Sequence, residues 1–232
     1  MLPYQSTMEE ELISIKDFFE KYPMKVFSKG EVIASSGDEI KSIFYIRSGI
    51  ARSFYIDENG DELTINLLKP FSFFPLSAVL AGKNNAYDFQ AFTKVEVNVS
   101  PVNEVLKYLN KNSDFKSILL KTFSIGLEGY LIRSFFLIKG SAVQKVASSL
   151  MMLAKRFGGK NGNSIIIDLP LTHQDIANLA GITRETASIH IEILEKEKII
   201  SRNRKHTLIL DYPGLTQKAT IGEDGNLLDF SF

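Results

Sequence analysis

The chain has 232 residues, a formal net charge of zero, 44% hydrophobic residues and no cysteine. This length and apolar content allow two domains with proper hydrophobic cores and exclude wholesale disorder, while the absence of cysteine excludes disulfides, thiolate zinc sites, iron–sulfur clusters and thiol redox sensing. No apolar run reaches the length of about 18 residues that a membrane helix needs, and the start of the chain is acidic instead of a basic leader, so we expect a cytoplasmic protein without membrane contact.

The first half of the chain changes from one helical pattern to a series of short strands. Residues 9–22 have the apolar spacing of an amphipathic helix that ends before Pro23. From Met24 to about Val99, short runs rich in Val, Ile, Phe and Tyr alternate with turn residues. The strongest hairpin signal is Asn59-Gly60, and Glu62 to Leu68 is its return strand. This pattern predicts an all-β roll or barrel.

A long apolar helix follows the strands. Helical periodicity restarts at Pro101, and the segment from Ser113 to Ile138 has the pattern of one helix with large apolar residues at every third or fourth position. Gly126 and Gly129 each lower helix propensity by about 1 kcal/mol. This helix could pack as a core element against the roll. Its apolar surface exceeds what one small roll can cover, so we expect a parallel dimer helix that a second copy of the chain covers.

The segment after the long helix contains a hinge, a helix and a strand. Lys139-Gly140-Ser141 has the composition of a hinge, and Ala142 to Phe157 that of a helix. Residues 158–163, which are rich in glycine and asparagine, are expected to form a flexible loop before a strand from Ser164 to Leu169.

Charge is unevenly distributed along the chain. Between Lys139 and Leu215 there are 11 Lys+Arg against 7 Asp+Glu, a net charge of +4, whereas residues 1–138 and 216–232 each carry a net charge of −2. The mild basic excess falls on the segment that also carries the motifs described next. It favours a nucleic-acid partner, with modest affinity per subunit and a need for dimerisation.

Residues Leu171 to Glu197 predict two short helices around a sharp turn. Thr172 is placed to cap the first helix, and Asp175 three residues later comes close to completing a capping box. Gly181 can take the positive φ that ends this helix. Thr183 is the expected N-cap of the second helix, whose apolar residues recur at helical spacing. Two helices joined by a short turn with glycine describe a helix-turn-helix.

The polar face of the second helix carries residue types that suit base recognition. In a helix-turn-helix, the first residues of this helix meet base edges in the major groove. Arg184 can donate two hydrogen bonds to guanine O6 and N7, Glu185 can accept from cytosine N4, and Ser188 is short enough for close approach. We therefore predict base reading by Arg184, Glu185, Ser188 and the capping Thr183. The alternative is an ordinary helical hairpin with a solvated polar face.

Two short strand-like runs follow, Ile199 to Ser201 and Thr207 to Leu210. The residues between them, Arg202-Asn203-Arg204-Lys205-His206, are strongly basic. A helix-turn-helix followed by such a hairpin is a winged helix, whose tip lies along phosphates and adds affinity without reading sequence. We predict phosphate contacts by Arg202, Arg204 and Lys205.

The order of roll, long helix, hinge and winged helix resembles the Crp/Fnr family of bacterial transcriptional regulators, from about Val26 to Leu215. In the roll, the resemblance lies in KGEVIASSGD (Lys29 to Asp38), FYIRSGIAR (Phe44 to Arg52) and DENGDE (Asp57 to Glu62). In the DNA-reading part, it lies in LTHQDIANLAGITRETAS (Leu171 to Ser188). The resemblance implies an α+β fold with an N-terminal β-roll (a double-stranded β-helix, jelly-roll-like), a long dimerisation helix and a C-terminal winged helix-turn-helix.

The same resemblance implies roles for individual residues. Arg184, Glu185 and Ser188 fall on base-reading positions of the family, whereas Thr172, His173 and Gln174 fall near phosphates. Many members have an arginine directly after the position of Ser188, but this chain has Ile189. A guanine contact is therefore expected to be missing, and the operator to differ from the usual half-sites. RNA polymerase is the further partner that a regulator of this kind implies.

The predicted roll, which binds the regulatory ligand in other members, departs further from the family pattern. Cyclic-nucleotide members hold the ribose and cyclic phosphate with a Gly-Glu pair and an Arg-Ser or Arg-Thr pair. The corresponding run, Pro70 to Phe92, contains only Lys83 and Asp88 as charged residues, and no arginine lies between Arg52 and Arg133. A cyclic phosphate would be poorly held without a guanidinium. The three histidines all lie in the DNA-binding part, so we expect no haem held by histidine, and methionine or the N-terminus would be the remaining axial ligands. We predict no cofactor.

Aromatic residues dominate this run instead. They could surround a small apolar or aromatic effector, or they could simply fill the roll where other members hold a ligand. The predicted pocket residues are Phe71, Phe73, Phe74, Tyr87, Phe89 and Phe92.

Together these observations predict a homodimeric, sequence-specific transcription factor on a pseudo-palindromic operator, controlled neither by a cyclic nucleotide nor by an iron–sulfur cluster. The expected domains are a roll over 1–110, a dimerisation helix over 111–139, a winged helix-turn-helix over 140–215 and a tail over 216–232. We expect no enzyme activity, because the sequence has no G-x-S-x-G, no P-loop and no histidine–carboxylate cluster. The alternative is a module that binds a small apolar ligand and acts through protein contacts, which would show exposed apolar residues at the wing.

Overall fold

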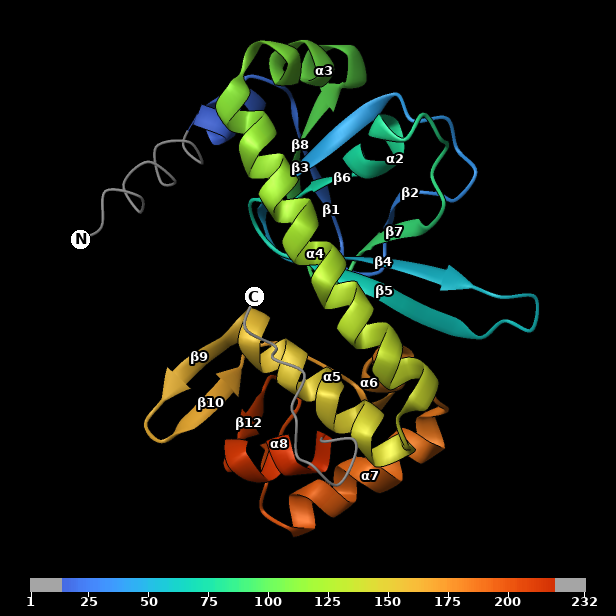
Figure 1. Cartoon of the computed structure of the whole chain (residues 1–232), viewed down its shortest axis with the longest axis vertical. Helices are drawn as coiled ribbons and strands as arrows, with labels where there is room; N and C mark the ends of the chain where they lie inside the picture. The colour runs from blue at the N-terminus through green and yellow to red at the C-terminus, as the bar shows by residue number, and fades with distance from the viewer. Residues whose placement is uncertain (1–13, 220–232) are drawn as a thin grey trace. The chain divides into compact units, whose positions relative to one another are not determined.

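The computed structural model describes residues 14–219 (Figure 1). Within these residues the chain divides into two compact units, one comprising residues 14–60 and 64–124 and the other residues 61–63 and 125–219. The first unit contains the predicted roll, and the second contains the predicted helix-turn-helix and wing. The predicted α+β class is therefore confirmed.

The roll consists of two four-stranded sheets, with strand orders β1-β8-β3-β6 and β2-β7-β4-β5. Pairing within them is antiparallel wherever the register is defined, as in Met24 opposite Asn98 and Tyr45 opposite Asn98 on either side of β8. The strands are β1 (Met24–Phe27), β2 (Val32–Ala34), β3 (Ser42–Ser48), β4 (Ala51–Ile56), β5 (Glu62–Leu68), β6 (Phe73–Phe74), β7 (Asp88–Ala91) and β8 (Val95–Pro101).

Glycine turns connect these strands as the sequence predicts. Gly60 has a φ of 86° between β4 and β5, and its amide donates to the carbonyl of Asp57 at 3.1 Å, so the Asn59-Gly60 hairpin is confirmed. Gly49 turns β3 into β4 with a φ of 78°. A Cβ at Gly49 would lie only 2.0 Å from the carbonyl oxygen of Lys94, so no other residue fits there without moving the backbone.

Buried side chains of the first unit form two clusters, one under the helices and one inside the roll. The helix-side cluster contains Ile15, Phe18, Phe19, Ile43, Tyr45, Leu76, Val105, Leu109, Phe115 and Leu119. The roll-side cluster contains Ile46, Ala51, Phe74, Phe89, Ala91, Val95 and Val97. Strand β3 serves both clusters because alternate side chains of a strand point to opposite faces, so Tyr45 and Ile46 belong to different clusters.

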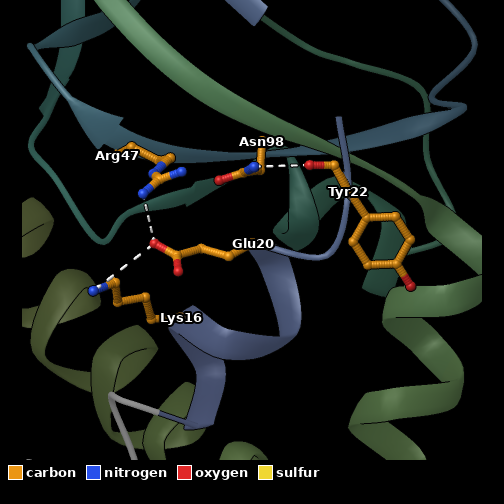
Figure 2. Close-up of polar contacts among 5 residues, drawn as sticks. All are labelled: Lys16, Glu20, Tyr22, Arg47 and Asn98. Carbon is orange, nitrogen blue, oxygen red and sulfur yellow. Dashed lines mark hydrogen bonds and ion pairs between the residues drawn. The ribbon is translucent and has the colours of Figure 1, made fainter. Parts of the chain in front are cut away.

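The N-terminal helix is held against the roll. Residues 14–19 are helical, and residues 9–13 of the predicted helix lie outside the described residues. Glu20 accepts from Arg47 of β3 at 2.8 Å, and the Asn98 side chain of β8 donates to the carbonyl of Tyr22 at 2.9 Å (Figure 2). Because the ion pair is partly exposed, it contributes at most about 1 kcal/mol. The stacking of Phe19 on Tyr45, with ring centroids 4.7 Å apart, provides the apolar anchor.

Helix α2 (Leu76–Leu80) interrupts the strands of the roll, where the sequence predicted strands and turns alone. The later helices agree with the sequence pattern, and α3 (Val102–Lys111) follows β8. Helix α4 (Ser113–Lys139) is one unbroken helix, as Figure 1 shows. Its predicted boundary with α5 (Ala142–Phe157) is confirmed, because Gly140 and Ser141 are not helical and Ser141 forms a capping box with Gln144.

The second unit differs from the sequence prediction at two places. Residues 158–163 were expected to form a flexible loop, but β9 (Gly158–Asn161) pairs with β10 (Ser164–Ile167) through a turn in which Gly162 has a φ of 60°. Helix α8 (Tyr212–Ala219) runs through the expected start of the tail at residue 216, and Leu215 and Ala219 are buried. The rest of the predicted tail, 220–232, lies outside the described residues.

Candidate nucleic-acid interface

Helix α6 (His173–Ala180) begins at a complete capping box. The Asp175 amide donates to the Thr172 hydroxyl at 3.1 Å, and the Thr172 amide donates to the Asp175 carboxylate at 2.7 Å. The sequence suggested only an approximate box, because aspartate is one methylene shorter than the usual glutamate. At the other end, Gly181 has a φ of 60° and a ψ of 47°, the left-handed conformation that the sequence predicted.

Helix α7 (Arg184–Lys196) presents the predicted reading residues at its start. Its N-cap is Thr183, whose hydroxyl accepts from the Thr186 amide at 3.3 Å. Ala187, Ile191 and Leu194 are fully buried and fix the rotation of the helix about its axis. Arg184 and Glu185 are exposed in the first turn, on the side of the helix that these buried residues leave free.

Ser188 is connected to the preceding helix. The Nδ1 atom of His173 lies 2.8 Å from the Ser188 hydroxyl, so residues predicted for phosphate and base contacts share a hydrogen bond. Burial lowers the pKa of His173, with a further lowering by Arg202 and Arg184 that Glu195 and Glu192 oppose. A neutral ring at His173 is thus favoured beside the reading helix. The sequence did not predict this bond, because the two residues lie on different helices.

The other two residues predicted near phosphates are exposed at the start of α6. The Thr172 hydroxyl is used by the cap, and the Gln174 amide nitrogen lies 2.6 Å from the Asn178 side-chain oxygen. Both side chains remain at the surface, so their roles as phosphate contacts stay predictions.

The wing is a hairpin of β11 (Ile200–Arg202) and β12 (Thr207–Ile209) in a sheet of order β11-β12-β10-β9. Asn203 organises its tip, because its side-chain oxygen accepts from the amides of Lys205 at 2.8 Å and His206 at 3.0 Å. Arg204 and Lys205 are exposed on this tip. The structure thus presents two basic side chains on a turn of fixed shape.

Arg202 has a different environment from the other two basic residues. Its guanidinium donates to the carbonyl of Leu171 at 2.7 Å and to the hydroxyl of Thr207 at 3.3 Å, and burial lowers its pKa. It therefore ties the base of the wing to the residue before the helix-turn-helix. This contact makes Arg202 a positioning residue, a role that the basic run in the sequence did not indicate.

Arg133 of α4 was not among the predicted site residues. Its guanidinium donates to the carbonyl of Leu179 at 2.8 Å, and burial lowers its pKa to about 10. The last carbonyls of a helix carry partial negative charge, so the contact is favourable. It holds the C-terminal half of α4 to the end of α6. The available signal was that Arg133 is the single charged residue between Glu128 and Lys139 of the helix.

The exposed apolar residues of α4 are numerous. Leu120, Leu127, Leu131 and Ile138 have exposed fractions of 71%, 59%, 55% and 74%. Phe123, Ile125, Tyr130 and Phe135 are also exposed. Such a concentration of large apolar side chains on one helix indicates an interaction surface.

The six rings of the predicted effector pocket are not all brought together. Phe74 and Phe89 are buried and stack at 4.5 Å inside the roll, with Tyr87 at 6.5 Å from Phe89. Phe73 instead packs against the helix-side cluster, where it contacts Phe19 and Phe115. Phe92 is buried, and Phe71 is 59% exposed.

Arg52 is the arginine nearest to this region in the sequence. Its Nε atom donates to the side-chain oxygen of Gln90 at 2.8 Å, and its guanidinium lies 4.5 Å from the ring centre of Phe54. Among residues 14–219, no three His, Asp or Glu side chains gather in a way that could hold a metal ion. No helix of these residues is long and apolar enough to cross a membrane.

A capped helix-turn-helix, a basic wing and a roll on the same chain define a DNA-binding transcription regulator. Two family models match it: the cyclic nucleotide-binding domain over residues 24–112 and the Crp-like helix-turn-helix domain over residues 144–218. The chain belongs to the Crp/Fnr family of bacterial transcriptional regulators. Because this family consists of regulators, the chain is not an enzyme.

Individual relatives agree with this assignment. The chain is 28% identical to the global nitrogen regulator of Nostoc sp. over 188 residues, which cover 78% of this chain and 82% of the relative. A CRP/FNR-family transcriptional regulator from Thermus thermophilus has a TM-score of 0.66 and 25% identity, with 85% of this chain and 98% of that chain covered. FixK2 from Bradyrhizobium japonicum shares the fold, with a TM-score of 0.75, 16% identity and coverage of 86% and 98%.

Proposed function

We propose that the protein acts as a homodimer on a pseudo-palindromic operator whose half-sites lie one helical turn apart, about 34–36 Å. The observation that carries this proposal is the exposure of Arg184 and Glu185 in the first turn of a capped, rigidly packed helix. An exposed guanidinium and carboxylate in this position suit guanine and cytosine edges in the major groove.

Specific roles follow for the residues of the interface. Arg184, Glu185, Ser188 and Thr183 read bases, and the His173 bond fixes the direction of the Ser188 hydroxyl. Phosphates are contacted by Thr172, His173, Gln174, Arg204 and Lys205. Of the predicted phosphate residues, Arg202 contributes mainly by holding the wing in place, because its guanidinium is already bonded to the Leu171 carbonyl.

We propose that a second copy of the chain packs against the exposed apolar residues of α4. Its exposed leucines lie on one face, because Leu127 follows Leu120 by two helical turns and Leu131 follows Leu127 by one, as an extended helix–helix contact requires. A dimer would also supply two readers related by a two-fold axis, which matches a two-fold symmetric operator.

We further propose that neither a cyclic nucleotide nor an iron–sulfur cluster controls the protein. Stacked Phe74 and Phe89 occupy the interior of the roll, and the Arg52 guanidinium is engaged with Gln90. Both observations favour the interpretation that the rings fill the roll, and a small apolar effector stays a prediction. The lack of cysteine removes the ligands of a cluster.

The proposed setting is the bacterial cytoplasm, with DNA and RNA polymerase as partners. The alternative, action through protein contacts, predicted exposed apolar residues at the wing. One apolar residue, Leu210 directly after the second strand, is exposed, but the tip itself exposes Asn203, Arg204 and Lys205, which suit phosphates.

A footprint on chromosomal DNA fragments tests the proposal. The full chain, purified without added ligand, should protect two symmetric segments one turn apart, with an affinity that falls steeply as salt rises. A matched experiment with Arg184→Ala should protect the same two segments only at higher protein concentration, with a relaxed preference at one base pair. Protection without symmetry, or an affinity that does not respond to salt, would contradict the proposed mode of binding.

A further inference from the structure

The exposed face of α7 contains two large apolar side chains, of which Ile189 lies nearer to the start of the helix. Its exposed fraction is 58%, whereas Ala187 and Ile191 of the same helix are fully buried. Ile189 lies four residues after Glu185, one helical turn further along the same face. Single exposed apolar residues are normal on protein surfaces, so exposure alone assigns no role to Ile189. Its place one turn after Glu185, on the face proposed to enter the major groove, is what points to a partner outside the chain.

The charges near Ile189 on the helix limit what that partner can be. Glu185 lies one turn before it and Glu192 lies three residues after it, and both carboxylates are exposed. These charges would repel a phosphate, so this part of the face is suited to base edges and not to the DNA backbone.

The major groove offers one apolar group, the 5-methyl group of thymine. Isoleucine suits this group because its branched Cβ leaves little rotamer freedom to lose on contact.

We infer that Ile189 is a specificity-determining residue that packs on a thymine methyl group in each half-site. The inference rests on the proposed function, and it assigns a T·A pair next to the base read by Glu185. The next exposed isoleucine, Ile193, lies one turn further from the start of the helix and is 36% exposed. Because base contacts come from the N-terminal part of a recognition helix, Ile193 lies outside them.

Replacement of thymine by deoxyuridine tests the inference, since it removes only the methyl group and keeps the base pair. The full chain is first used to select its preferred operator from random duplexes. Each thymine of the half-site is then replaced symmetrically by deoxyuridine. At one position, binding should weaken about fourfold per half-site, or about fifteenfold for both, as expected for one buried carbon on each side.

Two variants complete the experiment. Ile189→Ala should bind the thymine and deoxyuridine operators equally, and it should fold normally because alanine favours an exposed helix position. Ile193→Ala, the matched control, should keep the full difference between the two operators.

The possible failures are distinguishable. If the selection yields no common sequence, the proposed function is overturned and the inference with it. If a common sequence emerges but no thymine responds to removal of its methyl group, or if Ile189→Ala retains the response, the inference alone is overturned. In that case Ile189 faces a protein or solvent while Arg184 and Glu185 still read DNA.

Discussion

Arg184 and Glu185 owe their positions to neighbours that the sequence already indicated. The bond from the Thr186 amide to the Thr183 hydroxyl fixes where α7 begins, and loss of such a cap costs about 1 kcal/mol. The buried Ala187 then sets which side of the helix faces outward. The residues of α7 that we propose to read bases are therefore held by the fold, which would reduce the entropy lost on binding.

Arg184→Ala should weaken binding to the best operator by about 1–3 kcal/mol and relax the preference at one base pair. The physical reason is the loss of two hydrogen bonds to one guanine edge. Titrations against the best operator and its single-base-pair variants would measure both effects. A loss of equal size on unrelated sequences would instead place Arg184 on a phosphate.

His173 should make the second unit less stable in mild acid. Its folded-state pKa is lowered, by burial first and then by Arg202 and Arg184, whereas the unfolded chain titrates at about 6.5. The unfolded state therefore binds a proton first as the pH falls. Stability is full above pH 6.5, falls as the pH drops below that value, and levels off below the folded-state pKa.

Urea unfolding between pH 5 and 7 would measure this effect by comparing the wild type with His173→Gln, which should lose part of the pH dependence. His206→Gln is the matched control, because His206 lies at the wing tip and takes no part in the contact between His173 and Ser188. The hypothesis fails if the two variants have the same pH dependence as the wild type.

At the scale of elements, the residues of the wing have two roles: one anchors the base of the hairpin and the others form its exposed tip. Arg202 bonds to Leu171 and Thr207 at the base of the hairpin, while Asn203 shapes the turn that presents Lys205. The three residues are close neighbours in a basic run, yet the structure gives them different roles. A phosphate contact is expected from the exposed tip and not from the anchor.

Lys205→Ala should weaken binding to every sequence alike and reduce the slope of log affinity against log salt by about one unit. The reason is that one phosphate contact fewer releases one counterion fewer. Affinities at several salt concentrations, for a specific and a random duplex, would measure the slope. An unchanged slope would remove the wing tip from the phosphate contacts.

Elements that are stabilised by their own sequence were predictable, and elements stabilised by a neighbour were not. Helix α5 has a capping serine and an apolar stripe, so its bounds were predicted. Strand β9, Gly158-Gly159-Lys160-Asn161, has no apolar alternation and is wholly exposed. It exists because β10 pairs with it, which no local pattern reveals.

The same limit applies to the candidate sites. Phe73 and Phe74 were grouped into one pocket because they are adjacent and aromatic, but adjacent residues of a strand point to opposite faces. The structure accordingly sends Phe73 to the helix-side cluster and Phe74 into the roll. The bonds of Ser188 to His173 and of Arg202 to Leu171 join residues that are distant in the sequence, so only the fold reveals them.

At the scale of the whole molecule, the modest charge of the helix-turn-helix and wing favours the proposed dimer. The net charge of the chain is zero, and the excess of +4 between residues 139 and 215 supports only limited attraction to DNA. Two linked readers raise the overall affinity without any new contact, because the second binds at a high effective concentration. The apolar residues of α4 are therefore as important to the proposed function as the reading residues.

Leu131→Glu should convert the dimer to a folded monomer and abolish protection of the symmetric operator. Leu131 is 55% exposed, so a charge there leaves the fold of one chain intact but would be buried without a partner at a helix–helix contact. Sedimentation would measure the mass of the variant in solution, and footprinting would measure its occupancy of the operator.

Leu80→Glu is the matched control, because Leu80 is an exposed leucine on α2, outside α4. It should remain a dimer that binds DNA. If Leu131→Glu stayed dimeric, another surface would have to join the two copies, and if it bound the full operator as a monomer, the symmetric arrangement of readers would be wrong.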